Sequence, residues 1–97
     1  MTIYALSSPL GLSGVAVIRV SGSDAKNVIK SLTKGKFIEP RFASLKKIFK
    51  PDTNEIIDEG IILWFPGPES YTGEDMVEFH VHGSRAVIEA MYTSISK

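Results

Sequence analysis

Residues 67–84 read Gly-Pro-Glu-Ser-Tyr-Thr-Gly-Glu-Asp-Met-Val-Glu-Phe-His-Val-His-Gly-Ser, and this stretch decides the fold. It begins as a turn, because proline fixes φ, glycine allows positive φ, and such residues cluster between Pro66 and Gly73. From Asp75 the pattern alternates with a period of two, which is typical of a β-strand. One face of this strand holds Val77, Phe79 and Val81, and the other holds Met76, Glu78, His80 and His82. An apolar face packs into a core, so we predict that the face with a carboxylate and two imidazoles looks into a ligand pocket.

The composition indicates one small globular domain. The chain has 97 residues, enough for a single core, with 43% hydrophobic and 23% charged residues. Its formal net charge of zero argues against a nucleic-acid surface built on bulk positive charge. It has no cysteine, which excludes disulfides, thiolate nucleophiles and cysteine metal sites.

Targeting signals are not recognisable in the sequence. The first residues lack the basic region of a signal peptide, and no run approaches the roughly 20 apolar residues of a membrane span. We therefore expect a cytoplasmic protein that does not enter a membrane. The chain ends at Lys97 inside a predicted helix with no stop signal, which is typical of a piece of a longer protein.

Hydrophobic periodicity predicts an α+β fold, with a mixed sheet of about five strands and two helices packed on it. We expect Ser21 to cap the first helix and Ser84 to cap the second. A turn at residues 51–54 predicts a hairpin, and a slip in the alternation at Lys46-Lys47 suggests a bulge in an edge strand. The predicted strands cover residues 3–6, 15–20, 41–49, 55–65 and 75–82, and the predicted helices follow Asp24 and Ser84.

Two opposite charges stand on strands that are otherwise apolar. Arg19 interrupts the apolar run 15–20, and Glu78 interrupts the alternating strand. Burying a guanidinium without a partner is very unfavourable, so Arg19 should meet a carboxylate or an anionic ligand. If the strands are neighbours, the two side chains can form a bidentate salt bridge beside a pocket. A purely structural ion pair fits the same residues, and the sequence does not separate these interpretations.

The two histidines admit more than one role. Glu78, His80 and His82 follow one another at steps of about 7 Å along one strand face. A His-x-His pair can chelate zinc, but such a site needs a third protein ligand and the chain has no other histidine and no cysteine, so we predict no metal. His82 precedes the free amides of a helix N-terminus, where it can contact a bound ligand or simply close the turn.

Other polar and aromatic residues flank the turn. Tyr71 and Trp64 offer surfaces on which a planar heterocycle can stack, and either can equally belong to the core. Glu74 and Asp75 are adjacent, but neighbours on a strand point to opposite faces, so turn capping is favoured over shared acid–base work. We predict no catalytic residue. The Gly-Lys pair at 35–36 is not part of a P-loop, because that motif requires a glycine at position 30 and a serine or threonine at position 37.

Several segments together resemble the N-terminal domain of the tRNA-modification GTPase family (MnmE/TrmE). The resemblance spans nearly the whole chain, and its most specific block runs from Phe65-Pro66-Gly67-Pro68 to Glu74-Asp75. The other segments are Gly14-Val15-Ala16-Val17-Ile18-Arg19-Val20-Ser21-Gly22, Pro40-Arg41-Phe42-Ala43, Asp58-Glu59-Gly60, Glu78 and His82-Gly83.

The resemblance implies a domain, here residues 1–97, that binds a reduced folate and resembles the folate-binding domains of aminomethyltransferases. The expected folate is 5-formyl- or 5,10-methylene-tetrahydrofolate, which carries the one-carbon unit placed on C5 of the wobble uridine. Arg19 and Glu78 match folate-contacting positions, and His82 and Tyr71 are further candidates. The resemblance also implies a homodimer formed through this domain, a FAD-binding partner protein, and tRNA bound by the full complex.

Departures from the family pattern limit what carries over. Family members commonly have Gly-Arg-Gly-Gly where this chain has Gly11-Leu12-Ser13-Gly14, so no arginine role transfers to Leu12. We expect the helical and GTPase domains to lie beyond Lys97, so GTP, magnesium and potassium belong to that missing part and these 97 residues should not hydrolyse GTP. Two alternatives remain: a purely structural dimerisation domain, and a small metal-binding domain built on His80 and His82.

Overall fold

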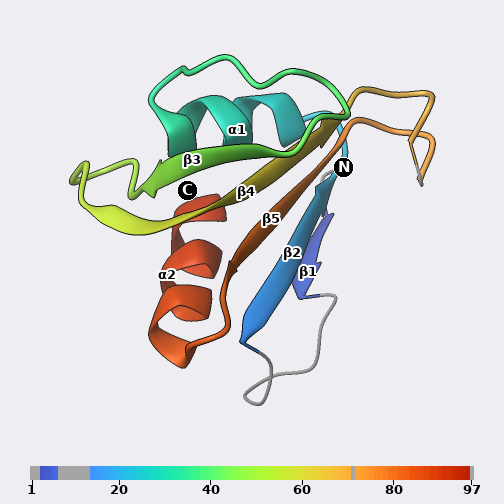
Figure 1. Cartoon of the computed structure of the whole chain (residues 1–97). Helices are drawn as coiled ribbons and strands as arrows, with labels where there is room; N and C mark the ends of the chain where they lie inside the picture. The colour runs from blue at the N-terminus through green and yellow to red at the C-terminus, as the bar shows by residue number, and fades with distance from the viewer. Residues whose placement is uncertain (1–2, 7–13, 71, 97) are drawn as a thin grey trace.

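A computed structural model describes residues 3–6, 14–70 and 72–96. It confirms the α+β class, with five strands and two helices in the expected order (Figure 1). The elements are β1 (Ile3–Leu6), β2 (Val15–Ser21), α1 (Ala25–Thr33), β3 (Ser44–Phe49), β4 (Ile56–Phe65), β5 (Met76–His82) and α2 (Arg85–Ile95).

The strands form one sheet in the order β1-β2-β5-β4-β3. All four strand pairs are antiparallel, which corrects the expectation of a mixed sheet. Parallel neighbours require a crossover connection, and here the helix after β2 carries the chain to the far edge instead of to an adjacent strand. The alternating strand β5 therefore lies at the centre, between β2 and β4.

Backbone conformation sets strand boundaries that differ slightly from the prediction. β3 begins at Ser44, because Arg41 has a φ of 65°, a left-handed value that a strand does not accommodate. β4 begins at Ile56, after Asn54 with a φ of 62° in the hairpin turn. The register shift lies between Ile48 and Phe49 instead of at Lys46-Lys47, and β3 is an edge strand as expected.

Only one of the two predicted caps forms. The Ser84 hydroxyl accepts from the Val87 amide and caps α2. Ser21 does not cap α1: it is the last residue of β2, and its hydroxyl bonds with the Thr72 hydroxyl at 2.7 Å. Asp24 occupies the N-cap position of α1 without a side-chain capping bond. The strand simply continues one residue further than its apolar run indicates.

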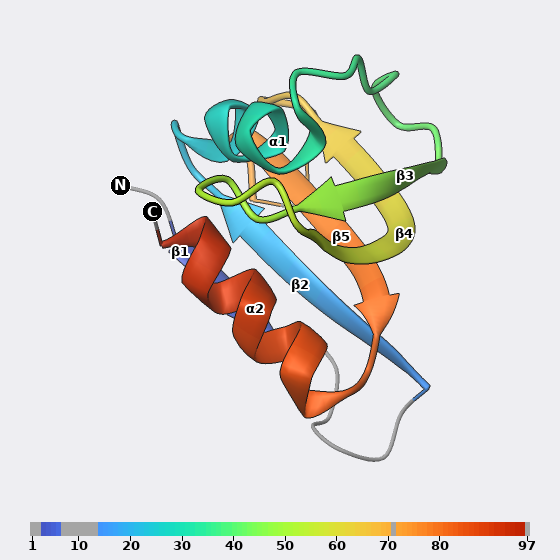
Figure 2. The same cartoon turned by 90° about the vertical axis from the view of Figure 1, so that its left-hand side faces the viewer.

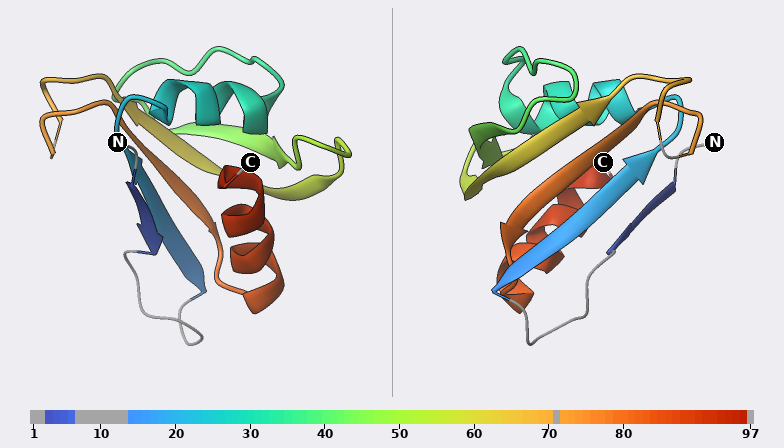
Figure 3. Two further views of the ribbon diagram at one scale, coloured as in Figure 1. Left: turned by 180° about the vertical axis from the view of Figure 1, so that it is seen from behind. Right: turned by 45° about the vertical axis from the view of Figure 1, so that its right-hand side comes forward.

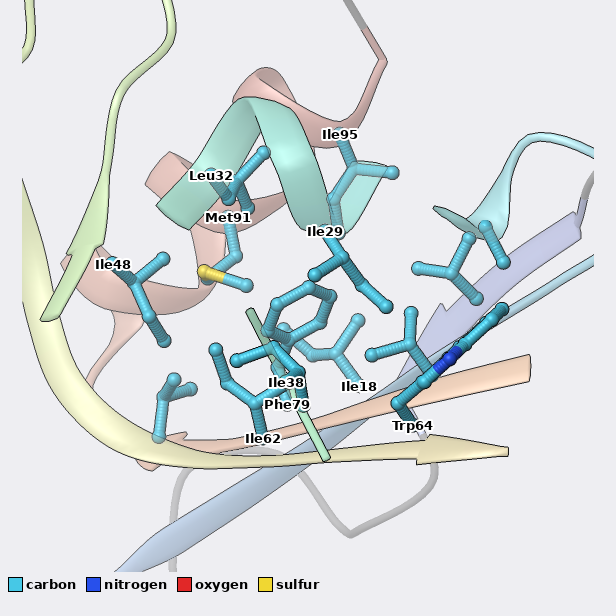
Figure 4. Packing of buried hydrophobic residues seen from close by; sticks show 14 of the residues in the cluster. Ile18, Ile29, Leu32, Ile38, Ile48, Ile62, Trp64, Phe79, Met91 and Ile95 are labelled. Carbon is cyan, nitrogen blue, oxygen red and sulfur yellow. The ribbon is translucent and has the colours of Figure 1, made fainter. Parts of the chain in front are cut away.

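Both helices cover the same face of the sheet (Figure 2). Between them and the strands lies a single core, in which Phe79 is fully buried beside side chains from both helices (Figure 4). Trp64 is 8% exposed and joins this core, so its interpretation as a core residue is the right one. The labelled members of the cluster are Ile18, Ile29, Leu32, Ile38, Ile48, Ile62, Trp64, Phe79, Met91 and Ile95.

The opposite face of the sheet carries no helix among the described residues, as the right-hand view in Figure 3 shows. We call it the open face. Its apolar side chains include Val15, 52% exposed, and Leu45, 61% exposed. In the described ranges, neither helix has the length and apolar character needed to cross a membrane.

Candidate ligand-binding site

Arg19 and Glu78 lie directly opposite each other on the paired strands β2 and β5. The Arg19 Nε donates to Glu78 Oε2 at 2.7 Å. The Glu78 side chain is 12% exposed and that of Arg19 is 43% exposed, so the carboxylate lies deep while the guanidinium reaches solvent. The condition set by the sequence, that the two strands be neighbours, is met.

His80 extends the pair into a three-residue network. Its Nε2 lies 3.0 Å from the second Glu78 oxygen, Oε1. Burial alone would raise the pKa of Glu78, but the hydrogen bonds and charges of His80 and Arg19 outweigh it, so the pKa lies below its ordinary value. Glu78 is therefore held as a carboxylate by one partner on each oxygen. The alternating pattern placed His80 on this face, but the link to Glu78 was not predicted.

His82 contacts a different carboxylate, which the sequence reasoning missed. Its Nδ1 lies 2.9 Å and 3.0 Å from the two oxygens of Asp58 in β4, and its backbone amide donates to the same side chain at 2.8 Å. Burial would raise the pKa of Asp58, but these hydrogen bonds lower it below its ordinary value. In the sequence, Asp58 was visible only as part of the resemblance. In the structure its side chain is 12% exposed, and it lies on β4, the strand that pairs with β5.

The contact with Asp58 fixes the orientation of the His82 ring. Because a carboxylate only accepts hydrogen bonds, Nδ1 carries the proton in this contact. Nε2 is then left as the atom that can meet a ligand, on a side chain that is 74% exposed. Both roles expected for His82, contact with a ligand and closure of the strand end, are compatible with this geometry.

A hollow of about 320 Å³ adjoins the two histidines. Val15, Leu45 and Ile61 supply apolar walls, and Gly60 forms part of the lining. This volume is at the lower end of the range for small-molecule pockets. A larger hollow of about 450 Å³ lies between α1 and the end of α2, and it contains none of the predicted site residues.

The remaining predicted residues are placed as follows. Tyr71 lies outside the described residues. The Asp75 carboxylate accepts from the Gly67 amide at 2.9 Å, which agrees with turn capping. Among the described residues no group of three or more histidine, aspartate or glutamate side chains is arranged to hold a metal ion, and His80 and His82 bond to different carboxylates.

Comparison with known proteins decides the family. Residues 2–97 match the family described as the GTP-binding protein TrmE N-terminus. The chain belongs to this family. The resemblance drawn from the Phe-Pro-Gly-Pro block and its companions is thereby confirmed for nearly the whole chain.

Individual relatives align with most or all of the chain. A tRNA modification GTPase MnmE of Pelagibacter ubique is 67% identical over 97 residues, covering 100% of this chain and 22% of that protein. The corresponding protein of Zymomonas mobilis is 47% identical over 96 residues, 99% of this chain and 22% of that protein. A mitochondrial tRNA modification GTPase of Dictyostelium discoideum is 54% identical over 93 residues, 90% of this chain and 18% of its own length. The chain thus spans about a fifth of these relatives.

Acid is expected to weaken the fold through Glu78 and Asp58. Both pKa values lie below their ordinary values of 4.5 and 3.8, so just below those values the unfolded chain binds more protons than the folded one. The contribution to stability is complete above the ordinary values and is lost as the pH falls through the folded ones. Denaturant unfolding followed by circular dichroism from about pH 6 down to about pH 2 should show this loss, and Glu78→Gln should flatten it. An unchanged pH dependence in that variant would contradict the assignment.

Proposed function

We propose that this chain is the reduced-folate-binding and homodimerising domain of a GTPase that modifies the wobble uridine of tRNA at C5. The names of its relatives support the whole-protein activity. The observation that carries folate binding is the Arg19–Glu78–His80 network, in which an ionised carboxylate contacts His80, and His80 in turn lines a hollow on the open face.

The carboxylate of Glu78 has acceptor capacity left for a ligand. In the contacts given for the described residues, Arg19 bonds to one oxygen and His80 to the other, whereas an ionised carboxylate offers about four acceptor positions in all. A pterin presents an amino group and ring N–H donors along one edge. Two such donors can therefore bond to Glu78 while Arg19 and His80 keep it in place.

The surroundings suit the rest of a reduced folate. Apolar side chains of the hollow, Val15 and Ile61, can cover the faces of the ring system, and His82, whose ring is oriented by Asp58, also lines the hollow. Tyr71 is the proposed aromatic contact from the loop. Bound 5-formyl- or 5,10-methylene-tetrahydrofolate supplies the one-carbon unit, and these residues bind and orient it.

The open face also supports the proposed homodimer. Val15 is 52% exposed and Leu45 is 61% exposed on a side of the sheet that no helix covers among the described residues. A second copy of the chain would bury it. We propose that the complete protein interacts with the FAD-binding partner protein and with tRNA, and that this domain binds the folate.

Glu78→Gln tests folate binding directly. The substitution keeps the shape of the side chain but removes the charge that accepts the pterin donors, and hydrogen bonds to charged groups contribute about 1.5–3 kcal/mol. We expect the Kd for 5-formyl-tetrahydrofolate, measured by calorimetry, to rise about 10- to 100-fold. Glu55→Gln, at an exposed carboxylate next to β4, is the matched control and should bind as the unchanged protein does.

Two results would overturn the folate assignment: no binding by the unchanged protein, or equal binding by Glu78→Gln with an unaltered thermal transition. Sedimentation of the same samples addresses the second candidate, a purely structural dimerisation domain, which the exposed apolar side chains of the open face favour. If Glu78→Gln loses the dimer along with the ligand, the network serves assembly. If it loses only the ligand, it serves binding.

A further inference from the structure

The zero net charge of this chain conceals a strong segregation of charge. Residues 26–50 hold eight of the eleven lysines and arginines but only one of the eleven acidic residues, Glu39. This segment therefore has a formal charge of +7, and the rest of the chain has −7. The net charge of the chain does not indicate a site for a polyanion, but the concentration of positive charge in residues 26–50 does.

Five of these lysines surround two adjoining hollows. One, of about 270 Å³, lies beside α1 and is lined by Lys26, Lys30 and Lys36. The other, of about 250 Å³, lies beside the edge strand β3 and is lined by Lys36, Lys46 and Lys47. Because Lys36 lines both, the positive charges form one continuous surface. We call it the lysine surface: Lys26, Lys30, Lys36, Lys46, Lys47 and the aromatic Phe37.

Phe37 gives this surface a second chemical character. Its side chain is 74% exposed, the highest value among the exposed large hydrophobic residues of the described chain, and it lines the hollow next to Lys36. A phenylalanine left in solvent among lysines is not needed by the core. An exposed ring inside a positive surface is the arrangement by which proteins stack on unpaired bases while cations track the backbone.

Two simpler explanations account for only part of this arrangement. Lysines on an edge strand prevent pairing with other sheets, which explains Lys46 and Lys47 but not the lysines of α1 or Lys36. Surface ion pairs could neutralise the charge, but none of the five lysines takes part in an ion pair with the described residues. One carboxylate, Glu59, lies at the rim of the second hollow.

We propose that the lysine surface binds RNA, with its lysines on phosphates and Phe37 stacked on an unpaired base. The choice of tRNA as the RNA rests on the proposed function. The surface adjoins the proposed folate site, because Leu45 and Glu59 line both the β3 hollow and the hollow beside His80. An RNA held there would lie next to the bound one-carbon donor.

Salt dependence gives the first test. Each phosphate contact lowers the logarithm of the binding constant by about 0.7–0.9 per tenfold increase in salt, so five lysines predict a slope of roughly −4. Fluorescence anisotropy of a labelled, unmodified tRNA transcript with the purified protein measures it. The double substitution Lys30→Gln with Lys36→Gln should reduce the slope by about 2 and weaken binding about tenfold or more at roughly 0.1 M salt.

Matched substitutions separate a specific surface from general charge. Lys36→Gln and Arg85→Gln remove the same charge, but Arg85 lies on α2 with a 90% exposed side chain, outside the lysine surface. Only Lys36→Gln should weaken tRNA binding, and equal effects of the two would overturn the proposal. Phe37→Ala should weaken binding of tRNA about tenfold and leave binding of a fully paired RNA duplex unchanged.

The outcomes also distinguish RNA from an acidic protein partner. If polyglutamate competes with tRNA as well as unlabelled tRNA does, and Phe37→Ala has no effect, the surface recognises acidic segments and the RNA assignment is wrong. Folate binding should be the same in Lys36→Gln as in the unchanged protein. If the protein binds folate but not tRNA, this inference alone is wrong. If Glu78→Gln binds folate as tightly as the unchanged protein does, only the folate assignment is wrong.

Discussion

Truncating Phe79 to alanine is expected to lower the free energy of unfolding by about 3–5 kcal/mol. Phe79 is fully buried at the centre of the middle strand, and its ring contacts the core shared by the sheet and both helices (Figure 4). Removing the ring forfeits its transfer free energy and leaves a cavity that a packed interior fills only in part. Small domains are stable by only about 5–15 kcal/mol, so this loss is a large share of the total.

Phe37→Ala is the matched control for Phe79→Ala, because the same atoms are removed from a side chain that is 74% exposed. Its unfolding free energy should change by less than about 0.5 kcal/mol, as for an ordinary surface substitution. Urea unfolding at neutral pH measures both variants. Similar losses in the two would show that the core is not centred on β5.

Period-two alternation was enough to find β5 and its faces. Val77, Phe79 and Val81 are buried, and Glu78 and His80 lie on the open face, as their order in the sequence requires. Periodicity was equally informative for the second helix. Spacings of three and four residues place Ile88, Met91 and Ile95 on one side of a helix, and all three are buried.

Connections between strands were harder to predict, because they depend on long-range packing. Nothing local in the chain states that β2 lies next to β5, and the antiparallel order follows only once α1 has carried the chain to the far edge. The same limit applies to Asp58. Its partner His82 is 24 residues away, and only the pairing of β4 with β5 brings the two side chains together.

Charge shows the limit in another form. Arg19 and Glu78 could be paired from the sequence, because an isolated charge on an apolar strand requires a partner. The contact of His80 with Glu78 could not be predicted in the same way, because an imidazole on a half-exposed face does not require a charged partner. In the structure its place two residues from Glu78, on the same face, brings Nε2 within 3.0 Å of the carboxylate.

Gly60→Ala is expected to lower the free energy of unfolding by about 3 kcal/mol, the upper range for overpacking. A Cβ at this position would overlap the backbone oxygen of His80 and lie 3.3 Å from Val81 Cγ1. Backbone of the central strand cannot move aside as a flexible side chain can, so β4 and β5 would have to separate. Gly14→Ala is the matched control, since no atom of the described residues lies within 4 Å of a Cβ added there.

The close approach at Gly60 also links the fold to the proposed site. It lets β4 lie close against its antiparallel neighbour β5 beside His80, which places Asp58 against His82 and forms one wall of the hollow. Gly60→Ala should therefore lose affinity for 5-formyl-tetrahydrofolate even in the fraction that remains folded, which calorimetry at low temperature can resolve. Gly14 also lines this hollow, so Gly14→Ala is the control for stability alone. A variant that is destabilised yet binds folate normally would show that the contact supports the sheet but not the site, and the role of the Asp58–His82 pair in orienting a ligand would then be wrong.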